Sequence, residues 1–217
     1  MIDILFSVPS KISKSREQSG QTSKKLIEAA IDLFSRKGFK GTSIRDIAAE
    51  MKMTTSNIYH YFDTKEGLLA AIEQQTLEPI TREFRRIASL DMPPLDRFVL
   101  LIRTHLAYLD VHRKESLIFS SLSEETFPPG RKDLNKKFQT ETFFIYRSEI
   151  ERLLSSIGMK KNSTILAFST LGSVIWFLRW YRPEGDMTFD EVANAIIDYI
   201  LSGITGNGQI TKRKSNK

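Results

Sequence analysis

Apolar side chains recur along most of the chain at the spacing of an amphipathic helix, and no stretch shows the sustained alternation of a strand. This pattern predicts an all-α fold of about nine helices. The first long helix is expected over residues 23–37, where Ile27, Ala30 and Phe34 share one face. Gly38 follows at the position where a left-handed glycine commonly ends a helix.

Two short helices are expected next. Ile44, Ile47 and Met51 repeat at helical spacing, and Ser43 stands at the N-cap position before them. The second helix covers residues 54–62, and its first turn offers only hydroxyl and amide groups. Its opposite face carries the side chains expected to pack behind it, which are Ile58, Tyr61 and Phe62. A bracing helix followed by one with polar N-terminal side chains is typical of a helix-turn-helix, which reads base edges in the DNA major groove.

The segment from Leu26 to Ile72 resembles the DNA-binding domain of the TetR family of transcriptional regulators. The residues that match the family pattern in order and spacing are Ala29, Ala30, Phe34, Lys37, Gly38, Phe39, Thr42, Ser43, Ile44, Arg45, Asp46, Ile47, Ala48, Tyr59, His60, Tyr61, Phe62, Lys65, Glu66, Leu68 and Leu69. The chain departs from the family in the turn between the two short helices. There Lys52 replaces a frequent glycine, and a left-handed conformation at this residue costs roughly 1–2 kcal/mol.

The side chains expected to contact DNA are Ser43, Arg45, Thr54, Thr55, Ser56, Asn57, Tyr59, His60 and Lys65. The first turn of the second short helix can reach base edges, where Asn57 suits adenine. Lys65 begins the next helix, so its cation and the backbone amide donors there together favour phosphate. His60 is not expected to bind a metal, because the other histidines, His105 and His112, lie far along the chain.

A long fourth helix is expected to link the DNA-binding domain to the rest of the chain. Asp63 and Glu66 have the spacing of a capping box, which places the start of this helix near Thr64. Pro79 should kink or restart the helix, because proline has no N–H and its ring clashes with the preceding turn. Such a helix would give a mechanical route from a bound ligand to DNA.

Further helices are expected over residues 95–111, 115–122, 138–157, 163–181 and 188–203. A loop is expected over 124–130, and Thr188 with Glu191 has the spacing of a capping box. The penultimate helix has no charge between Lys161 and Arg179, which invites a membrane interpretation. A membrane span needs about 20 mostly apolar residues, whereas this run is shorter and contains several polar side chains. The sequence therefore favours burial against protein.

The last two helices indicate self-association. They are apolar, and the first of them carries small residues, Ser169, Gly172 and Ser173, that permit close approach of another helix. In the resembling family these helices pair with their twins across a two-fold axis. A symmetric dimer of this kind reads a roughly palindromic DNA site. A core within a single chain remains the alternative interpretation.

The net charge of +6 is concentrated at the two ends. Residues 1–65 carry 11 Lys and Arg against 7 Asp and Glu, whereas residues 66–205 carry 17 against 19. This division is expected if only the N-terminal domain meets phosphate. The expected domains are a disordered basic leader (1–21), a helix-turn-helix domain (22–67), a ligand-binding and dimerisation domain (68–205) and a disordered basic tail (206–217). The tail is interpreted as a solubilising end, with a DNA-contacting arm as the alternative.

The absence of cysteine removes disulfides and thiolate sites and fits a reducing cytoplasm. The leader lacks the basic start of a signal peptide. The sequence contains no nucleophile elbow, phosphate loop or HExxH motif. The protein is therefore expected to be a cytoplasmic regulator without catalytic activity, cofactor or membrane partner.

The stretch from Gly172 to Gly185 resembles a TetR subgroup that governs fatty-acid and steroid breakdown and responds to acyl-coenzyme A thioesters. An acyl chain favours an aromatic cavity, and coenzyme A phosphates favour arginines. The residues expected to bind such a hydrophobic effector are Phe143, Arg147, Trp176, Arg179, Trp180 and Arg182. The alternative for Arg179 and Arg182 is that they only solvate the helix end and favour its dipole.

The predicted function is a ligand-responsive repressor that binds double-stranded DNA as a homodimer and is released by a hydrophobic effector, for which an acyl-coenzyme A thioester is the candidate. An activator of the same fold is one alternative. The other is an acyl-binding enzyme or carrier that does not bind DNA.

Overall fold

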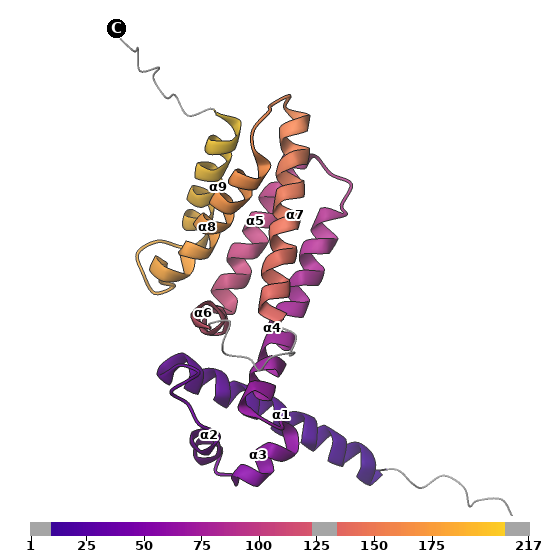
Figure 1. Cartoon of the computed structure of the whole chain (residues 1–217), viewed down its shortest axis with the longest axis vertical. Coiled ribbons are helices and arrows are strands. Elements are labelled where there is room, and N and C mark those ends of the chain that lie inside the picture. The colour runs from indigo at the N-terminus through magenta and orange to yellow at the C-terminus, as the bar shows by residue number, and fades with distance from the viewer. Residues whose placement is uncertain (1–9, 123–133, 207–217) are drawn as a thin grey trace, which may run out of the picture. The chain divides into compact units, whose positions relative to one another are not determined.

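The computed structural model describes residues 10–122 and 134–206, and these residues form nine helices and no strand (Figure 1). The helices are α1 (Ser10–Lys37), α2 (Ile44–Glu50), α3 (Thr55–Tyr61), α4 (Lys65–Ala88), α5 (Pro94–Val111), α6 (Arg113–Ser121), α7 (Leu134–Ser156), α8 (Ser163–Trp180) and α9 (Phe189–Thr205). The expected all-α fold is confirmed. None of the helices in the described ranges is both long and apolar enough to cross a bilayer.

The described residues divide into two compact units. The head comprises residues 10–73 with 117–122, and the body comprises residues 74–116 with 134–206. The sequence placed the corresponding boundary between residues 67 and 68. The helix α4 belongs to both units, because it is continuous across their boundary.

The core of the head is built from apolar side chains of α1, α2, α3 and the start of α4. Leu26, Ile47, Ile58 and Leu68 are fully buried, and the ring of Phe34 packs edge-on against that of Phe39 at a centroid distance of 5.1 Å. The helices α2 and α3 have 7 residues each, which is too short for independent stability in water. Their folding therefore depends on this shared core.

Hydrogen bonds at the start of α2 confirm Ser43 as its N-cap. The Ser43 hydroxyl accepts a hydrogen bond from the Asp46 amide at 3.1 Å, and the Asp46 carboxylate accepts one from the Ser43 amide at 2.8 Å. Lys37 adds an ion pair to Asp46 at 3.0 Å. The hydrogen bonds from Ser43, followed by that from Lys37, hold the pKa of Asp46 well below its usual value.

The first helix begins earlier than the sequence indicated. The sequence predicted a disordered leader over residues 1–21 and a helix from residue 23. The helix α1 instead begins at Ser10, so residues 10–21 are helical and that prediction is wrong for them. These residues lack apolar periodicity, which removed the signal used for the prediction. They do contain several lysine, arginine, glutamate and glutamine residues, which extend a helix once it is nucleated. Residues 1–9 lie outside the described part of the chain.

The fourth helix starts at the expected place with a different cap. The hydroxyl of Thr64 accepts a hydrogen bond from the Gly67 amide at 2.9 Å, so the expected capping box of Asp63 and Glu66 is wrong. The helix then runs unbroken for 24 residues through Pro79, so the expected restart does not occur. Proline leaves the carbonyl one turn earlier without its usual amide donor, which is a local weakness inside α4.

In the body, α5 packs against α7, α8 and α9 (Figure 1). Two sets of hydrogen-bonded polar side chains lie within this core. Glu149 is fully buried and accepts hydrogen bonds from Arg97 at 2.6 Å and from Arg152 at 2.5 Å. His105 and Tyr146 are also buried, with 3.0 Å between the His105 Nδ1 and the Tyr146 hydroxyl. Glu149 and the His105–Tyr146 pair thus have polar partners in the core, which offsets the cost of burying them.

The ends of the last helices agree closely with the sequence. Thr188 and Glu191 form the expected capping box at the start of α9. The helix ends at Gly206, which has a left-handed φ of 75°, and not at the expected Gly203. The expected loop over 124–130 and the basic tail after Gly206 lie outside the described residues.

Candidate nucleic-acid interface

The turn between α2 and α3 takes the strained conformation that the sequence predicted. Lys52 has a φ of 52°, and no other described residue except glycine has a positive φ. The amide of Met53 donates to the carbonyl of Ala48 at 2.9 Å and closes the turn. The turn therefore keeps the backbone that a glycine would adopt, at a cost of roughly 1–2 kcal/mol.

The N-terminal end of α3 is exposed and polar. The hydroxyl of Thr54 caps the helix by accepting a hydrogen bond from the Asn57 amide at 3.2 Å, which confirms its expected role. Ser56, Asn57 and His60 are exposed, whereas Ile58 is fully buried beneath them. The helix thus presents short polar side chains outward while its back anchors it to the head. Tyr61 and Phe62 are only half-buried, although the sequence placed them in the core.

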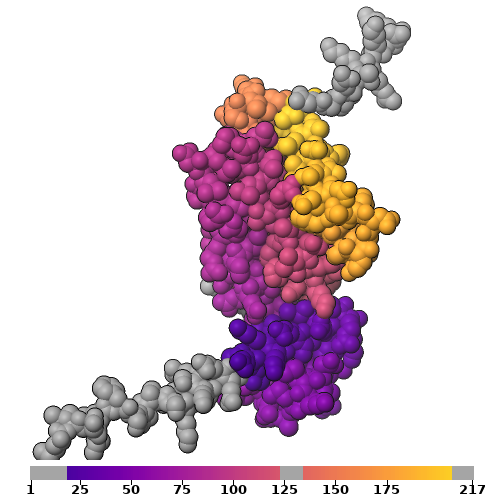
Figure 2. Space-filling view, turned by 180° about the vertical axis from the view of Figure 1, so that it is seen from behind, coloured from indigo at the N-terminus to yellow at the C-terminus, as the bar shows by residue number. Residues whose placement is uncertain are grey.

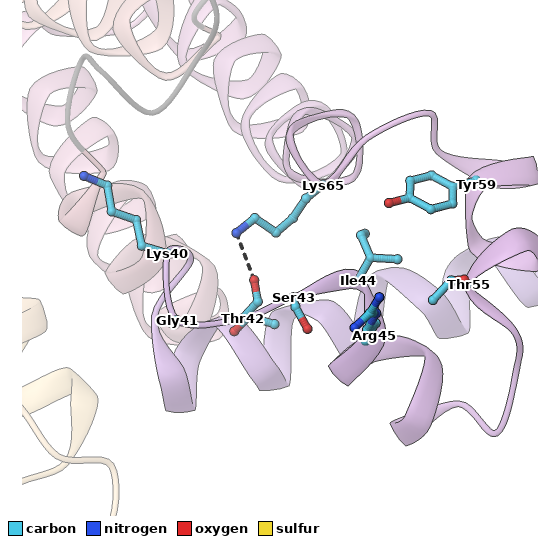
Figure 3. A pocket seen from close by; sticks show the side chains of 9 residues that line it. All are labelled: Lys40, Gly41, Thr42, Ser43, Ile44, Arg45, Thr55, Tyr59 and Lys65. Atoms are coloured by element: carbon cyan, nitrogen blue, oxygen red, sulfur yellow. Dashed lines mark hydrogen bonds between the residues drawn. The ribbon is translucent and has the colours of Figure 1, made fainter.

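A hollow of about 720 Å³ lies beside α3 on the surface of the head (Figure 3). Its lining residues are Lys40, Gly41, Thr42, Ser43, Ile44, Arg45, Thr55, Tyr59 and Lys65. They come from the turn before α2, from α2 itself, from α3 and from the first residue of α4. The hollow therefore joins three separate parts of the chain, namely residues 40–45, α3 and the start of α4, and its rim carries both cationic and hydroxyl groups.

The turn before α2 is held tightly against the end of α1. The buried hydroxyl of Thr42 donates to the carbonyls of Gly38 at 2.9 Å and Leu33 at 3.3 Å. A side chain at Gly41 would place its Cβ 2.3 Å from the carbonyl oxygen of Lys37, so this position requires glycine. The segment that leads into α2 thus has a fixed backbone.

The ammonium of Lys65 reaches this turn from α4. Its Nζ donates to the carbonyl of Thr42 at 2.8 Å and to that of Phe39 at 2.9 Å, and Figure 3 shows the first of these bonds. It also lies 4.3 Å from the centroid of the Phe39 ring, within the range of a cation–π contact. Lys65 is therefore engaged by protein groups on three sides.

The cations of the head differ in how far they are available. Lys37 is paired with Asp46 at 3.0 Å, and Arg36 lies 3.9 Å from Glu50. Lys40 and Arg45 are exposed on the hollow. Exposed cations beside an exposed helix end are the groups that a phosphate backbone attracts.

The structure brings the nine residues expected to contact DNA onto one region of the head. Ser43, Arg45, Thr55, Tyr59 and Lys65 line the hollow, and Thr54, Ser56, Asn57 and His60 lie on the adjoining surface of α3. Sequence reasoning missed Lys40, which lines the same hollow. Its signal was available, because Lys40 lies in the glycine-bounded turn directly before the N-cap of α2.

Four of the six residues expected to bind an effector are exposed, and they lie on α8 or directly after it. Trp176 and Trp180 are 64% and 42% exposed, so they do not line an enclosed aromatic cavity within the described chain. Arg179 and Arg182 are also exposed, and Arg182 donates to the carbonyls of Arg179 and Tyr181 at the end of α8. The alternative given from the sequence, in which these arginines serve the helix end, is consistent with this geometry.

The two remaining residues of that set lie on α7. The ring of Phe143 packs against that of Phe168 at a centroid distance of 4.6 Å, and Arg147 pairs with Glu151 at 3.0 Å. Phe168 is 64% exposed, so this aromatic contact lies at the surface of the body.

Comparison with known protein families agrees with this architecture. Residues 26–72 match the model for bacterial regulatory proteins of the tetR family, and residues 91–204 match the model for the tetracyclin repressor-like C-terminal domain. The chain belongs to the tetR family. The resemblance drawn from the sequence is thereby confirmed, and the head and body correspond to the two family domains.

Related proteins extend over most of the chain. The transcriptional repressor KstR2 of Rhodococcus jostii is 24% identical over 192 residues, which cover 87% of this chain and 94% of the relative. The solved structure of KstR2 of Mycobacterium tuberculosis, a ketosteroid transcriptional regulator, has a TM-score of 0.77 at 19% identity and covers 84% of this chain and 94% of its own. At that identity the likeness shows the fold alone.

A further solved structure contains both a ligand and DNA. It is AibR in complex with isovaleryl coenzyme A and operator DNA, which has a TM-score of 0.66 at 25% identity and covers 82% of this chain and 96% of its own. The chain described here is thus a TetR-family transcriptional regulator with relatives that include named repressors.

Proposed function

We propose that this regulator is a repressor that binds a palindromic operator as a homodimer and leaves it when a hydrophobic effector binds the body. The observation that carries the proposal is the exposed polar N-terminus of α3, which is anchored by Ile58 and flanked by the cationic hollow. A helix end of this kind fits the DNA major groove. The naming of KstR2 relatives as repressors supports repression over activation.

In the proposed complex, α3 supplies the base contacts. Thr55, Ser56 and Asn57 occupy its first turn, where short side chains can approach base edges. The carboxamide of Asn57 suits adenine, because its NH2 group can donate to N7 while its Oδ1 accepts a hydrogen bond from the N6 amino group. Tyr59 and His60 lie one turn later and reach either bases or phosphates.

The rim of the hollow supplies the phosphate contacts. Lys40 and Arg45 carry exposed cations, and Ser43 adds a hydroxyl at the N-terminus of α2. Contacts of this type fix the register of the protein on the duplex and make affinity fall with salt. The ammonium of Lys65 lies on the same surface.

The proposed dimer uses α8 and α9. The large apolar side chains exposed on these two helices are Ile165, Phe168, Ile175, Trp176, Trp180 and Tyr199. Gly172 and Gly203 face open space, since a Cβ added to either would meet no atom within 4 Å. In the space-filling view the yellow surface of α9 forms one edge of the body (Figure 2). An apolar face of this size with two glycines permits close packing of a second copy, as oligomer interfaces require.

The effector is proposed to be an acyl-coenzyme A thioester. This choice is supported by the likeness to AibR, whose solved complex contains isovaleryl coenzyme A, and by the resemblance of residues 172–185 to an acyl-responsive subgroup. Phe143, Arg147, Trp176, Arg179, Trp180 and Arg182 remain the predicted effector set. Because Trp176 and Trp180 are exposed, we propose that their main role is in the contact between the two subunits.

Release from DNA is proposed to act through α4. This helix is continuous from its first residue, Lys65, which lines the hollow, into the body, so a shift of α4 in each protomer would alter the separation of the two α3 helices. That separation must be close to one DNA turn, about 34–36 Å, for both helices to dock. A ligand can move this equilibrium only by binding one state more tightly than the other.

Selection of duplexes from a random pool tests the proposal. The purified chain should enrich a palindromic sequence, and the selected duplex should be displaced by acyl-coenzyme A thioesters in a gel-shift titration. Free coenzyme A serves as the control for non-specific ionic effects. Failure to enrich any sequence would contradict the DNA-binding function, whereas enrichment without displacement would contradict the effector class alone.

A further inference from the structure

Lys65 is bound in a way that separates it from the other cations of the hollow. Its Nζ donates to the carbonyls of Phe39 at 2.9 Å and Thr42 at 2.8 Å and lies over the ring of Phe39. An ammonium group has three N–H donors, and two of them are thus directed at backbone carbonyls of the same protein. Lys40, by contrast, is an exposed side chain of the same hollow.

The contacts of Lys65 join segments far apart in the sequence. Its two carbonyl partners lie 26 and 23 residues earlier, in the turn between α1 and α2, whereas Lys65 is the first residue of α4. The turn is fixed to α1 by the buried hydroxyl of Thr42 and by the close backbone approach at Gly41. Lys65 adds a link from this turn to α4.

The balance of interactions favours retention of this link when DNA is present. The two hydrogen bonds from Lys65 have a charged donor and are partly buried, so they are stronger than neutral, exposed hydrogen bonds. A phosphate could meet only the third N–H of this ammonium without displacing a carbonyl, and an exposed contact of that kind would be screened by salt. Lys40 and Arg45, the other two cations that line the hollow, are exposed and therefore available to phosphate.

We propose that Lys65 is a positioning residue, whose ammonium ties the turn before α2 to the start of α4 and is not among the groups that neutralise DNA phosphate. The turn leads directly into Ser43 and Arg45, so the tie sets where α2 begins and how it supports α3. The part of this inference that concerns DNA rests on the proposed function. The tie itself is a property of the head without DNA.

The two possible roles of Lys65 differ in their salt dependence. A cation that neutralises a phosphate releases counterions, so its removal lowers the slope of log affinity against log salt by about 1. A positioning residue instead sets the fraction of molecules whose head is ready to dock. Its removal divides the affinity by a factor that is the same at every salt concentration.

The test compares Lys65→Met with Lys40→Met in the full chain. Methionine keeps a long apolar side chain but cannot donate a hydrogen bond or carry charge. Affinity for the selected duplex is measured by fluorescence anisotropy over a series of salt concentrations. We expect Lys65→Met to weaken binding about tenfold with the wild-type slope, and Lys40→Met to lower the slope by about 1. A slope lowered by about 1 in Lys65→Met would overturn the inference.

A second measurement needs no DNA. Amide hydrogen exchange over residues 38–43 should become faster in Lys65→Met and stay at the wild-type rate in Lys40→Met, because only the first variant loses the tie. Unchanged exchange in Lys65→Met would overturn the inference. If the wild-type chain bound no duplex, the proposed function would fail, and the exchange rates would still decide whether the tie exists.

Lys65→Gln covers the case in which Lys65→Met does not fold. Glutamine has no charge but retains an amide donor that can bind one of the two carbonyls. A positioning role predicts an affinity below that of the wild type, with the wild-type slope. A phosphate-contacting role predicts a slope lowered by about 1, which would overturn the inference.

Discussion

Three residues of this regulator, Lys52, Asn57 and His105, have a backbone conformation or an environment that a substitution can test. Lys52 holds a left-handed backbone at a φ of 52° in the turn before α3. Asn57 is exposed in the first turn of α3, the helix that follows this turn. In the body, His105 is buried beside Tyr146, and this burial lowers the pKa of His105 from 6.5 to about 3. Each of the three observations leads to a measurement at one position.

Lys52→Gly should stabilise the head. Glycine adopts a positive φ without the steric penalty of a Cβ, so the midpoint of thermal unfolding should rise by an amount equivalent to about 1 kcal/mol. Lys52→Ala is the matched control, because it removes the charge and keeps the strain. Equal stabilisation by both substitutions would show that charge, and not backbone strain, is responsible.

Asn57→Ala should relax DNA preference at one or two base pairs of each half-site. Loss of a bidentate contact to adenine reduces discrimination there by about 1–3 kcal/mol. Competition assays with single-base variants of the selected duplex measure this effect. Arg45→Ala is the control, since loss of a phosphate contact should weaken all duplexes evenly. Unchanged selectivity in Asn57→Ala would place base reading elsewhere on α3.

His105→Gln should reduce the loss of stability in acid. Because the folded pKa of His105 is about 3, the unfolded chain binds a proton below pH 6.5 that the folded chain does not. This difference destabilises the wild type by up to about 1.4 kcal/mol per pH unit as pH falls. Glutamine can still bond to Tyr146 and does not titrate, so denaturant unfolding of the two proteins should diverge below pH 6.5. Parallel pH profiles would contradict this account.

At the scale of helices, the sequence predicted what depends on near neighbours. The caps at Ser43, Thr54 and Thr188 follow from local hydroxyl groups, and all three are present. The start of α1 was wrong because its first turns have no apolar face. The partners of Lys65 could not be predicted, since a tie across 23 residues and more leaves no local pattern. Exposure of Trp176 and Trp180 on α8 could not be predicted, because an apolar composition does not tell which side chains of a helix are buried.

Pro79→Ala tests the weak point of α4. Alanine restores the amide donor to the preceding turn and is the better helix former, so the body should gain up to about 3 kcal/mol. Pro79 is exposed, which leaves room for the substitution. Denaturant unfolding measures the change, and Glu78→Ala, at the neighbouring exposed position, is the control for general helix propensity. Destabilisation by Pro79→Ala would contradict this account.

At the scale of the whole molecule, charge and apolar surface mark two different partners. The net positive charge of the chain lies at its ends, with 11 Lys and Arg against 7 Asp and Glu in residues 1–65, whereas large apolar side chains are exposed on α8 and α9. Phosphate attracts the first surface, and a second copy covers the second in the proposed assembly. Dimerisation and DNA binding should therefore be separable by substitution.

Trp176→Glu should produce a monomer. A carboxylate in the middle of the proposed contact would be desolvated without a partner, so sedimentation velocity should show loss of the dimer. Val111→Glu is the matched control, since Val111 is 77% exposed but lies at the end of α5. A Trp176→Glu variant that remained dimeric would place the subunit contact on another surface.

The most direct test of the central claim, that α3 reads DNA, is an anisotropy titration of the wild-type chain with the selected duplex and with a shuffled duplex of the same composition. The account predicts saturable binding to the selected duplex that is tighter by about 10³-fold or more and that weakens as salt is raised. Absence of binding to either duplex at low ionic strength would contradict it.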